Sequence, residues 1–363
     1  MELTIRTSEL QDMVSKVIKC SSNNKLLPLT SLMSIKVESN FLTLATTDGT
    51  NYFYSRKEDR VDCEDFEVSV IADLFTKLVQ KTTAEEIKLQ IENGILSVKG
   101  NGTYKVELPF DENGNPIKFP KKIKSDFREE AGSIKLSTIK NVINANKPSL
   151  AVNMEYPALT CYYCGDSVIT SDRKKICDTA IKMFEKPMLI TSTLMELLGS
   201  VSMEDIEVTL TDDDVVFTSG NDTIYAPITE GVDTFPVEAI LGLVKSEFAS
   251  SCKIAKTSIL NIIDRLSLFV SPYDKRGIYL TFNNEGIMLR SKKSSGEELI
   301  PFIESNNFNP YTCCIDIEML RSQIATCEED TIEIHYGSEI AIKLVNKNIV
   351  QIVALLEDDR MEA

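Results

Sequence analysis

An internal repeat with a period of about 120 residues most constrains what this chain can fold into. Two different strand–turn–strand patterns each occur three times, in the same order in each third of the sequence. The first has equivalent residues at Thr47, Ser171 and Ser291, and the second begins at Ile87, Ile206 and Ile332. Alternating apolar and polar residues around a short turn are typical of β-hairpins. We therefore expect three similar thirds.

Helical segments precede the hairpins. In each segment apolar residues recur every three or four positions, which predicts an amphipathic helix, and Ser8 is expected to cap the first one. The expected ranges are 8–20, 70–81, 136–146, 192–200, 257–269 and 316–325. Each third then reads as two β-α-β-β halves. This order favours an α+β fold class in which two helices of each third pack on antiparallel sheets.

Two Phe-Pro pairs, Phe119-Pro120 and Phe235-Pro236, close the first and second thirds. The first pair is followed by a stretch rich in Lys and Glu, and the last third has no such pair. These features predict domains at residues 1–129, 130–245 and 246–363. The candidate edge strands are Thr103–Leu108 and Gly286–Arg290, although the sequence does not rank them.

The net charge of −16 excludes a protein that grips DNA phosphates with its whole surface. Any contact with nucleic acid would need cations gathered on one surface of an acidic body. The sequence has no apolar run of about 18 residues, so no membrane-spanning helix and no membrane partner are expected. The first residues lack the pattern of a signal peptide, which favours a cytoplasmic protein.

The single histidine, His335, excludes sites that need two or more histidines. Phosphate-binding loops and serine-nucleophile motifs are also missing from the sequence. His335 alternates with Ile332 and Ile334, so its side chain is expected to point outward as a bystander. No catalysis, metal or cofactor is therefore expected.

The nine cysteines are an odd number in a chain without a secretory signal, which predicts free thiols. Cys161 and Cys164 form the one CxxC motif. Residues 158–163 look like a strand, in which positions i and i+3 point to opposite faces. The run Asp212–Asp214 lies in a hairpin turn, where Asp is common. A metal-dependent enzyme built on either group is kept as an alternative hypothesis.

Several cations lie on the predicted helices, away from their apolar stripes. Lys16 and Lys19 belong to the first helix, and Lys77 and Lys81 share one flank of theirs. Acidic runs such as Asp212–Asp214 lie elsewhere. These cations form either a basic helix face or an ordinary solvated surface.

Four segments resemble the bacterial β sliding clamps, the beta subunit of DNA polymerase III. They are the opening Met1–Leu10, the Leu27-Pro28 step, the strand end Leu44–Asp48, and the run Tyr225–Pro236. Together they occur in the order and spacing of that family, over nearly the whole chain. The resemblance implies three clamp-type domains in a head-to-tail homodimer that closes into a ring. It implies helices lining the hole, double-stranded DNA inside it, and a role as a processivity factor that tethers the replicative DNA polymerase.

The resemblance also implies two sets of site residues. The DNA-facing set is Lys16, Lys19, Lys25, Lys77, Lys81, Lys140, Lys147, Arg265 and Arg321. The second set forms a cleft for short motifs of the polymerase, the clamp loader and other clamp-binding proteins. It comprises Leu159, Thr170, Arg173, Lys174, Ile176, Pro236, Leu241, Ile352 and Ala354. Without the resemblance, Leu159, Leu241 and Ile352 would read as core residues.

The sequence departs from the family at this cleft. The segment Thr170–Ile176 is more basic than the family pattern, and the C-terminal run Val353–Ala363 replaces the usual ending. Partner motifs are therefore expected to bind weakly or selectively. A non-catalytic scaffold that reuses the clamp fold without encircling DNA is the alternative to the sliding clamp.

Overall fold

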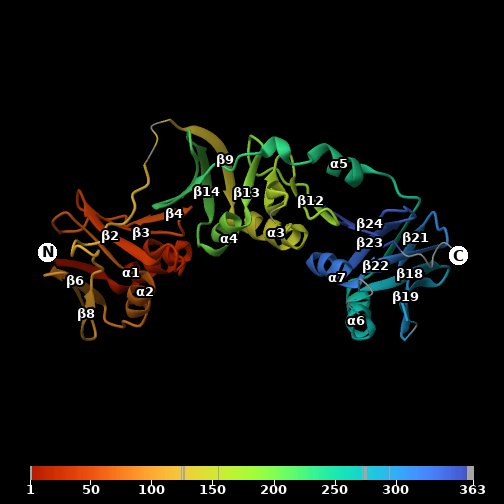
Figure 1. Cartoon of the computed structure of the whole chain (residues 1–363), viewed down its shortest axis with the longest axis horizontal. Helices are drawn as coiled ribbons and strands as arrows, with labels where there is room; N and C mark the ends of the chain where they lie inside the picture. Colours follow the sequence, from red (N-terminus) through yellow and green to blue (C-terminus); the bar gives the residue numbers. More distant parts are fainter. Residues whose placement is uncertain are drawn as a thin grey trace. The chain divides into compact units, whose positions relative to one another are not determined.

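The computed structural model describes residues 2–123, 125, 127–153, 155–271, 273, 276–293 and 295–357. The chain forms two compact units (Figure 1). Unit 1 comprises Met1–Ile139 and Thr193–Ile228, and unit 2 comprises Lys140–Ser192 and Thr229–Ala363. The predicted division into three domains is not tested by these two units and stays a prediction.

The first third contains helices α1 (Thr7–Val17) and α2 (Ala72–Gln80), which pack against each other. Its strands are β1 (Glu2–Arg6), β2 (Leu32–Glu38), β3 (Phe41–Thr47), β4 (Tyr52–Arg56), β5 (Phe66–Ile71), β6 (Glu86–Glu92), β7 (Ile95–Lys99) and β8 (Thr103–Glu107). Leu10, Val14 and Val17 are buried on one side of α1, as the apolar spacing predicts. The predicted cap at Ser8 is wrong, because Arg6 holds the N-cap position and makes no capping side-chain hydrogen bond.

The second third repeats this order. Its helices are α3 (Leu136–Asn146) and α4 (Ser192–Ser200). Its strands are β9 (Glu129–Lys135), β10 (Cys161–Cys164), β11 (Val168–Ser171), β12 (Lys175–Thr179), β13 (Met188–Thr191), β14 (Asp205–Leu210), β15 (Asp214–Ser219) and β16 (Asp222–Pro227). Residues Pro157–Thr160 form a 3-10 turn, so the strand expected at 158–163 begins only at Cys161.

The last third adds helix α5 (Val237–Lys245) before the repeat, which continues with α6 (Lys256–Leu266) and α7 (Ile317–Thr326). Its strands are β17 (Ser250–Ala255), β18 (Gly277–Asn283), β19 (Gly286–Ser291), β20 (Glu297–Pro301), β21 (Glu304–Asn306), β22 (Tyr311–Asp316), β23 (Thr331–Tyr336), β24 (Ala341–Asn346) and β25 (Ile349–Ala354). Buried side chains of α6, α7 and both neighbouring sheets form one apolar cluster that includes Ile263, Leu320 and Leu344.

Antiparallel sheets connect the thirds. Unit 1 holds a sheet of order β1-β6-β7-β8 and a sheet of order β5-β2-β3-β4-β16-β15-β14-β9. Unit 2 holds a sheet of order β13-β10-β11-β12-β25-β24-β23-β17-β21 and a sheet of order β20-β19-β18-β22. Strand β4 of the first third thus pairs with β16 of the second, and β12 of the second pairs with β25 of the last. A continuous ladder of backbone hydrogen bonds crosses each of these two boundaries.

Two expectations about the sheet edges have different outcomes. The predicted strand at residues 103–108 is an edge strand, β8. The predicted edge at Gly286–Arg290 is wrong, because β19 pairs with β18 on one side and with β20 on the other. The edge of that sheet is β20, whose Pro301 suits an edge position because proline cannot donate a ladder hydrogen bond.

The lone histidine lies on the strand β23 as predicted. Ile332 and Ile334 are buried, whereas His335 is half-buried and its Nε2 lies 3.0 Å from Oε1 of Glu333. None of the described helices has both the length and the apolar character needed to cross a membrane.

Candidate DNA-facing and peptide-binding sites

Lys16 of α1 is not a free cation. Its side chain is 18% exposed, and its Nζ lies 2.6 Å from the carboxylate of Asp12 and 3.0 Å from that of Asp222 on β16. Asp222 is buried and also accepts a hydrogen bond of 2.6 Å from the hydroxyl of Ser55 on β4. Burial lowers the pKa of Lys16, but the hydrogen bonds and charges of the two carboxylates outweigh it and raise the pKa overall.

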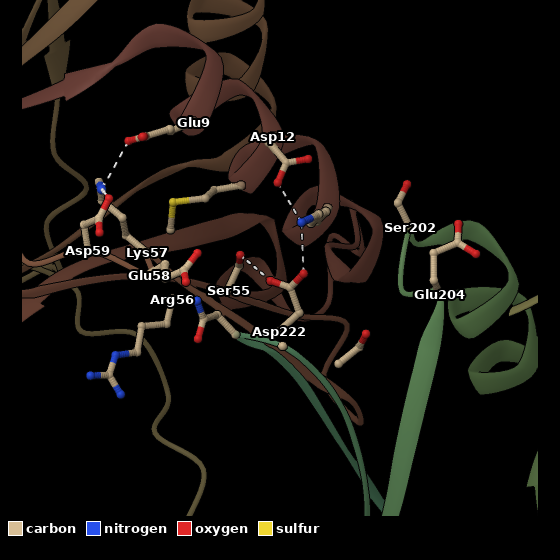
Figure 2. Close-up of a pocket in the computed structure, with 15 residues that line it drawn as sticks. Glu9, Asp12, Ser55, Arg56, Lys57, Glu58, Asp59, Ser202, Glu204 and Asp222 are labelled. Atoms are coloured by element: carbon tan, nitrogen blue, oxygen red, sulfur yellow. Dashed lines mark hydrogen bonds and ion pairs between the residues drawn. The ribbon is translucent and has the colours of Figure 1, made fainter. Parts of the chain in front are cut away.

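This network lies in a pocket of unit 1 of about 490 Å³ (Figure 2). Acidic side chains dominate its lining, among them Glu9, Asp12, Glu204 and Asp222. Lys57 in the same pocket is paired with Glu9 and Asp59, both at 3.3 Å. The pocket therefore offers no concentration of positive charge to a phosphate.

Three more of the predicted DNA-facing residues are exposed but ion-paired. Lys77 lies 2.7 Å from Asp73, and the Nε of Arg321 lies 2.9 Å from Asp264. Arg265 donates two hydrogen bonds, of 2.7 and 2.6 Å, to Glu298 on β20. The hydrogen bonds of this pair raise the pKa of Arg265 and lower that of Glu298.

The remaining predicted cations lie on the surface. Lys147 is exposed at the end of α3. Four others are exposed and make no ion pair with another described residue: Lys19, Lys25, Lys81 and Lys140. They lie in the turn after α1, in the loop that follows, at the end of α2 and on α3. Their contact with DNA stays a prediction.

The apolar members of the predicted cleft lie together in unit 2. Leu159, Ile176 and Ile352 are buried in one cluster, against which the half-buried Leu241 of α5 packs. Ile176 of β12 and Ile352 of β25 are direct cross-strand partners. Pro236 is the N-cap of α5 and lines a second pocket with Tyr163 and Phe235. The rings of Tyr163 and Phe235 are stacked, with 5.1 Å between their centres.

Leu159 also forms part of a pocket of about 450 Å³, here called the Tyr156 pocket. Its lining residues are Ala151, Asn153, Glu155, Tyr156, Leu159, Asp172, Arg173 and Lys174. The guanidinium of Arg173 lies 4.6 Å from the ring centre of Tyr156, at a distance typical of a cation–π contact. The sequence pattern did not indicate that Tyr156 belongs to the site. Its position three residues before Leu159 was the one available signal.

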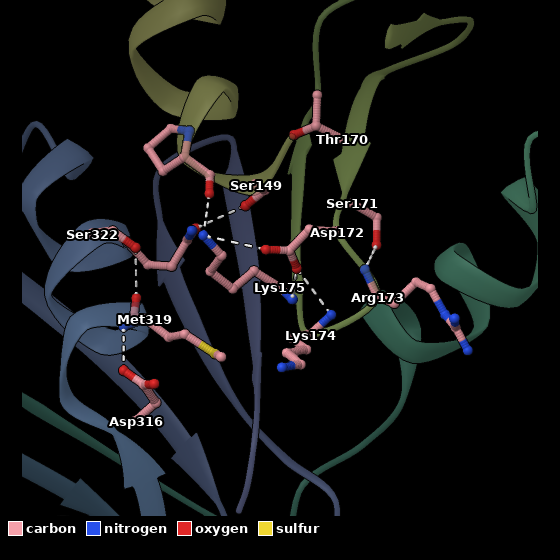
Figure 3. A network of polar contacts seen from close by, with 12 residues as sticks. Ser149, Thr170, Ser171, Asp172, Arg173, Lys174, Lys175, Asp316, Met319 and Ser322 are labelled. Carbon is pink, nitrogen blue, oxygen red and sulfur yellow. Dashed lines mark hydrogen bonds and ion pairs between the residues drawn. The ribbon is translucent and has the colours of Figure 1, made fainter. Parts of the chain in front are cut away.

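The turn that carries Arg173 and Lys174 is held by short-range hydrogen bonds (Figure 3). One carboxylate oxygen of Asp172 accepts from the backbone N–H groups of Lys174 and Lys175, at 2.9 and 2.6 Å. The side chain of Lys175 donates to the carbonyl of Pro148 and lies 3.4 Å from Asp172. Figure 3 shows the side chain of Arg173 extending away from this network.

Two of the predicted cleft residues occupy unexpected surroundings. Thr170 is fully buried, and its hydroxyl donates to the carbonyl of Asn146 at 2.8 Å, so its side chain cannot meet a ligand at the surface. Ala354, at the end of β25, donates its N–H to the carbonyl of Lys174. Residues 358–363 of the unusual C-terminal run lie outside the described residues.

Lys343 on β24 is a functional candidate that the sequence pattern missed. Its ammonium donates to the carbonyls of Val244 and Ser246, at 3.2 and 2.6 Å, where α5 ends. The residue is only 9% exposed, and burial lowers the pKa of its side chain. Lys343 thereby fixes the helix that carries Leu241.

The groups of the enzyme hypothesis lie in ordinary structural surroundings. Cys161 packs in the apolar cluster of Leu159, and the Sγ of Cys164 lies 3.9 Å from the Sδ of Met183. Burial raises the pKa of both thiols. Asp214 lies 2.8 Å from Lys122, in the segment that links the first two thirds. Among the described residues, no three His, Cys, Asp or Glu side chains are grouped as they would be around a metal ion.

One family model matches the first part of the chain. Residues 1–114 match the family model of the DNA polymerase III beta subunit, N-terminal domain. No curated protein sequence matches the chain closely enough to assign a relative.

Solved structures match over nearly the whole chain. The beta subunit from the DNA polymerase of Streptococcus pyogenes matches with a TM-score of 0.86 at 14% identity, over 99% of this chain and 100% of that one. The DNA polymerase sliding clamp from Bacillus subtilis matches with a TM-score of 0.84 at 15% identity, over 99% of each chain. The DNA polymerase III subunit beta from Borrelia burgdorferi matches with a TM-score of 0.81 at 18% identity, over 98% and 99%.

These matches confirm the predicted α+β clamp fold, although the sequence is far from those of the solved structures. Residues 1–114 match the family of the DNA polymerase III beta subunit, and the chain as a whole has the fold of the bacterial beta sliding clamps.

Proposed function

We propose that this chain is a sliding clamp: two copies close into a ring around double-stranded DNA and tether the replicative polymerase to it. The proposed activity needs no bond-making step, and it places the protein in the cytoplasm. In this proposal topology retains the protein on DNA, so weak and nonspecific contacts with phosphates suffice.

The pairing pattern of the sheets carries the proposal. In each third, the first half ends in strand β4, β12 or β20, and the second half ends in β8, β16 or β25. β4 of the first third pairs with β16 of the second third, and β12 of the second third pairs with β25 of the last third. By this rule β20 and β8 are the two strands without such a partner, and both lie at the edge of a sheet. Pairing β20 of one copy with β8 of another would complete the pattern.

Side chains around both edges fit such a contact. Phe269 is 52% exposed. Its ring lies close to Gly296, the residue that precedes β20: a side-chain carbon added to Gly296 would lie 3.7 and 4.0 Å from two ring carbons. Tyr104 on β8 and Leu74 on α2 are 49% and 50% exposed. Apolar side chains around an unpaired edge favour association with another chain. Because the two edges differ, the contact is heterologous, and in this proposal its rotation closes into a ring.

The charge distribution fits a weak hold on DNA. Lys16, Lys77, Arg265 and Arg321 are already paired with carboxylates, which leaves fewer cations for phosphates. The exposed Lys19, Lys25, Lys81 and Lys140 are the candidates for contact with the duplex. The polymerase, the clamp loader and other partners would bind by short motifs at the cluster of Leu159 and Ile352.

Retention on circular DNA tests the proposal. The protein is diluted until light scattering reports a monomer, mixed with nicked circular duplex, concentrated, and passed through a sizing column in 0.5 M salt. We expect it to elute with the circle and to be lost after the circle is cut once. Because high salt weakens phosphate contacts, only encirclement explains that difference. Equal retention on cut and uncut DNA, or none on either, would contradict the ring and favour the scaffold.

A further inference from the structure

The Tyr156 pocket combines an apolar floor with a basic rim. Leu159 is 5% exposed at the floor, and Ala151 is half-buried beside it. The side chains of Arg173 and Lys174, here called the basic rim, are exposed at the mouth. A pocket of this kind accepts an apolar side chain while the rim meets whatever lies next to it in the ligand.

The two carboxylates of the pocket accept hydrogen bonds within their own turns and keep their charge. Asp172 accepts the backbone N–H groups of Lys174 and Lys175 and lies near the ammonium of Lys175. Glu155 accepts a hydrogen bond of 3.4 Å from the side-chain amide of Asn153. The basic rim makes no ion pair with another described residue, so its charges are available to a ligand.

The backbone holds Arg173 in a conformation that few side chains adopt. Its φ is 74°, in the left-handed region that favours glycine. The turn compensates, because the N–H of Arg173 donates to the hydroxyl of Ser171 at 3.1 Å and the Asp172 carboxylate fixes the next two residues. The contact with Tyr156 then fixes the guanidinium at the mouth of the pocket. The turn and this contact together set the direction in which the side chain of Arg173 leaves the backbone.

We propose that the basic rim makes this pocket selective for peptides in which an Asp or Glu side chain lies next to an apolar residue. The inference rests on the proposed function, since it assumes that partner segments bind at this pocket. The apolar residue enters above Leu159, and the acidic side chain accepts hydrogen bonds from Arg173 and Lys174. Charge-assisted bonds of this kind are among the stronger ones available at a partly exposed site.

Paired peptides test the selectivity on the full-length protein. A labelled ten-residue peptide carries one Leu-Phe pair flanked by Gln and Ser, and a set of twins replaces each Gln in turn by Glu. Fluorescence anisotropy measures each affinity in 0.1 and 0.5 M salt. We expect one Glu twin to bind roughly tenfold more tightly than the Gln parent in low salt, with most of the gain lost in high salt.

Variants assign that gain to the basic rim. In Arg173→Gln with Lys174→Gln, the gain disappears, so that the Glu twin and the Gln parent bind this variant equally well. An unchanged midpoint of urea unfolding shows that the variant is folded. Arg173→Lys keeps part of the gain, because it preserves charge but not the planar contact with Tyr156. Lys347→Gln, at the opposite end of β25 from Ala354, is the matched charge control and keeps all of it.

The other outcomes are distinguishable. If every Glu twin binds like the Gln parent, or if the gain survives the double substitution, the selectivity is absent and the proposed function still stands. If no peptide binds at all, both the selectivity and the peptide site of the proposed function are wrong. A short DNA duplex added as competitor should leave the gain unchanged. Displacement of the Glu twin alone would assign the basic rim to phosphates and overturn the proposal.

Discussion

Single residues in this protein show that a cation on a helix is not always a surface charge. Lys16 follows the helical spacing of an exposed position, yet it lies over β16 with Asp12 on one side and Asp222 on the other. Asp222 is 6% exposed and is shared with Ser55 of β4. The lysine therefore stabilises the joint between the first two thirds more than it adds to an external field.

Replacing Asp222 by Asn tests this role. The substitution keeps the shape but leaves Lys16 half-buried with one exposed carboxylate, so we expect the free energy of unfolding to fall by about 2 kcal/mol. Urea unfolding measures the change. Asp12→Asn is the matched control, because Asp12 is 59% exposed and its removal should cost less than about 1 kcal/mol. Equal losses in the two variants would rule out a structural role for the buried pair.

At the scale of elements, helix α5 shows how a buried charge can fix a surface helix. The carbonyl of Val244 in its last turn and that of Ser246 just after it accept hydrogen bonds from Lys343 on β24. A cation at a helix C-terminus also interacts favourably with the helix dipole. The helix carries Leu241 into the apolar cluster, so its position matters for any peptide bound there.

The substitution Lys343→Met should weaken the attachment of α5 to β24 while a side chain of similar size still fills the space. The two carbonyls lose their donor, which we expect to cost about 1–3 kcal/mol and to speed hydrogen exchange in residues 240–246. Peptide affinity should fall severalfold as Leu241 loses its fixed position. Hydrogen exchange with mass spectrometry measures the effect. Lys347→Met, on the exposed turn of the same hairpin, is the control, and equal exchange in both variants would contradict the anchoring role.

Local sequence patterns predicted most elements but not how the elements join. The six helices and six hairpins followed from apolar spacing and turns, because those signals lie within a few residues of one another. The third strand of several halves, such as β4 and β16, was missed: each pairs with the strand before it, but its partner on the other side lies more than a hundred residues away. Helix α5 was missed beside Pro236. Burial of Thr170 and pairing of Lys16 likewise depend on partners that no local pattern names.

At the scale of the whole molecule, the same type of strand pairing joins successive thirds. Phe53 faces Ile224 in one joint, and Ile176 faces Ile352 in the other. Of the unmatched edges, β20 carries Glu297 and Glu298, whereas β8 carries Lys105 and Glu107. Like charges disfavour the pairing of β20 with a second β20, whereas the balanced charges of β8 do not oppose its pairing with β20.

Phe269→Asp should separate the subunits of the proposed ring. A carboxylate beside β20 would lose its hydration in the contact, so the solution mass should fall from about twice 40.6 kDa to the mass of one chain. Light scattering at micromolar concentration measures this. Leu26→Asp is the control, because Leu26 is 87% exposed in a loop that follows α1 and should leave the mass unchanged. A Phe269→Asp protein that keeps the doubled mass would place the contact elsewhere.

The modular pairing of thirds has a consequence for symmetry. Two such joints are present within the chain. In the proposed ring, the two ends of the run of thirds would complement each other in the same way. Ring size would then depend on the turn made at each joint, and the length of the chain would decide only how many copies share the circle. A gene that encoded two thirds instead of three would fill the same circumference with three polypeptides, at the expense of one more seam.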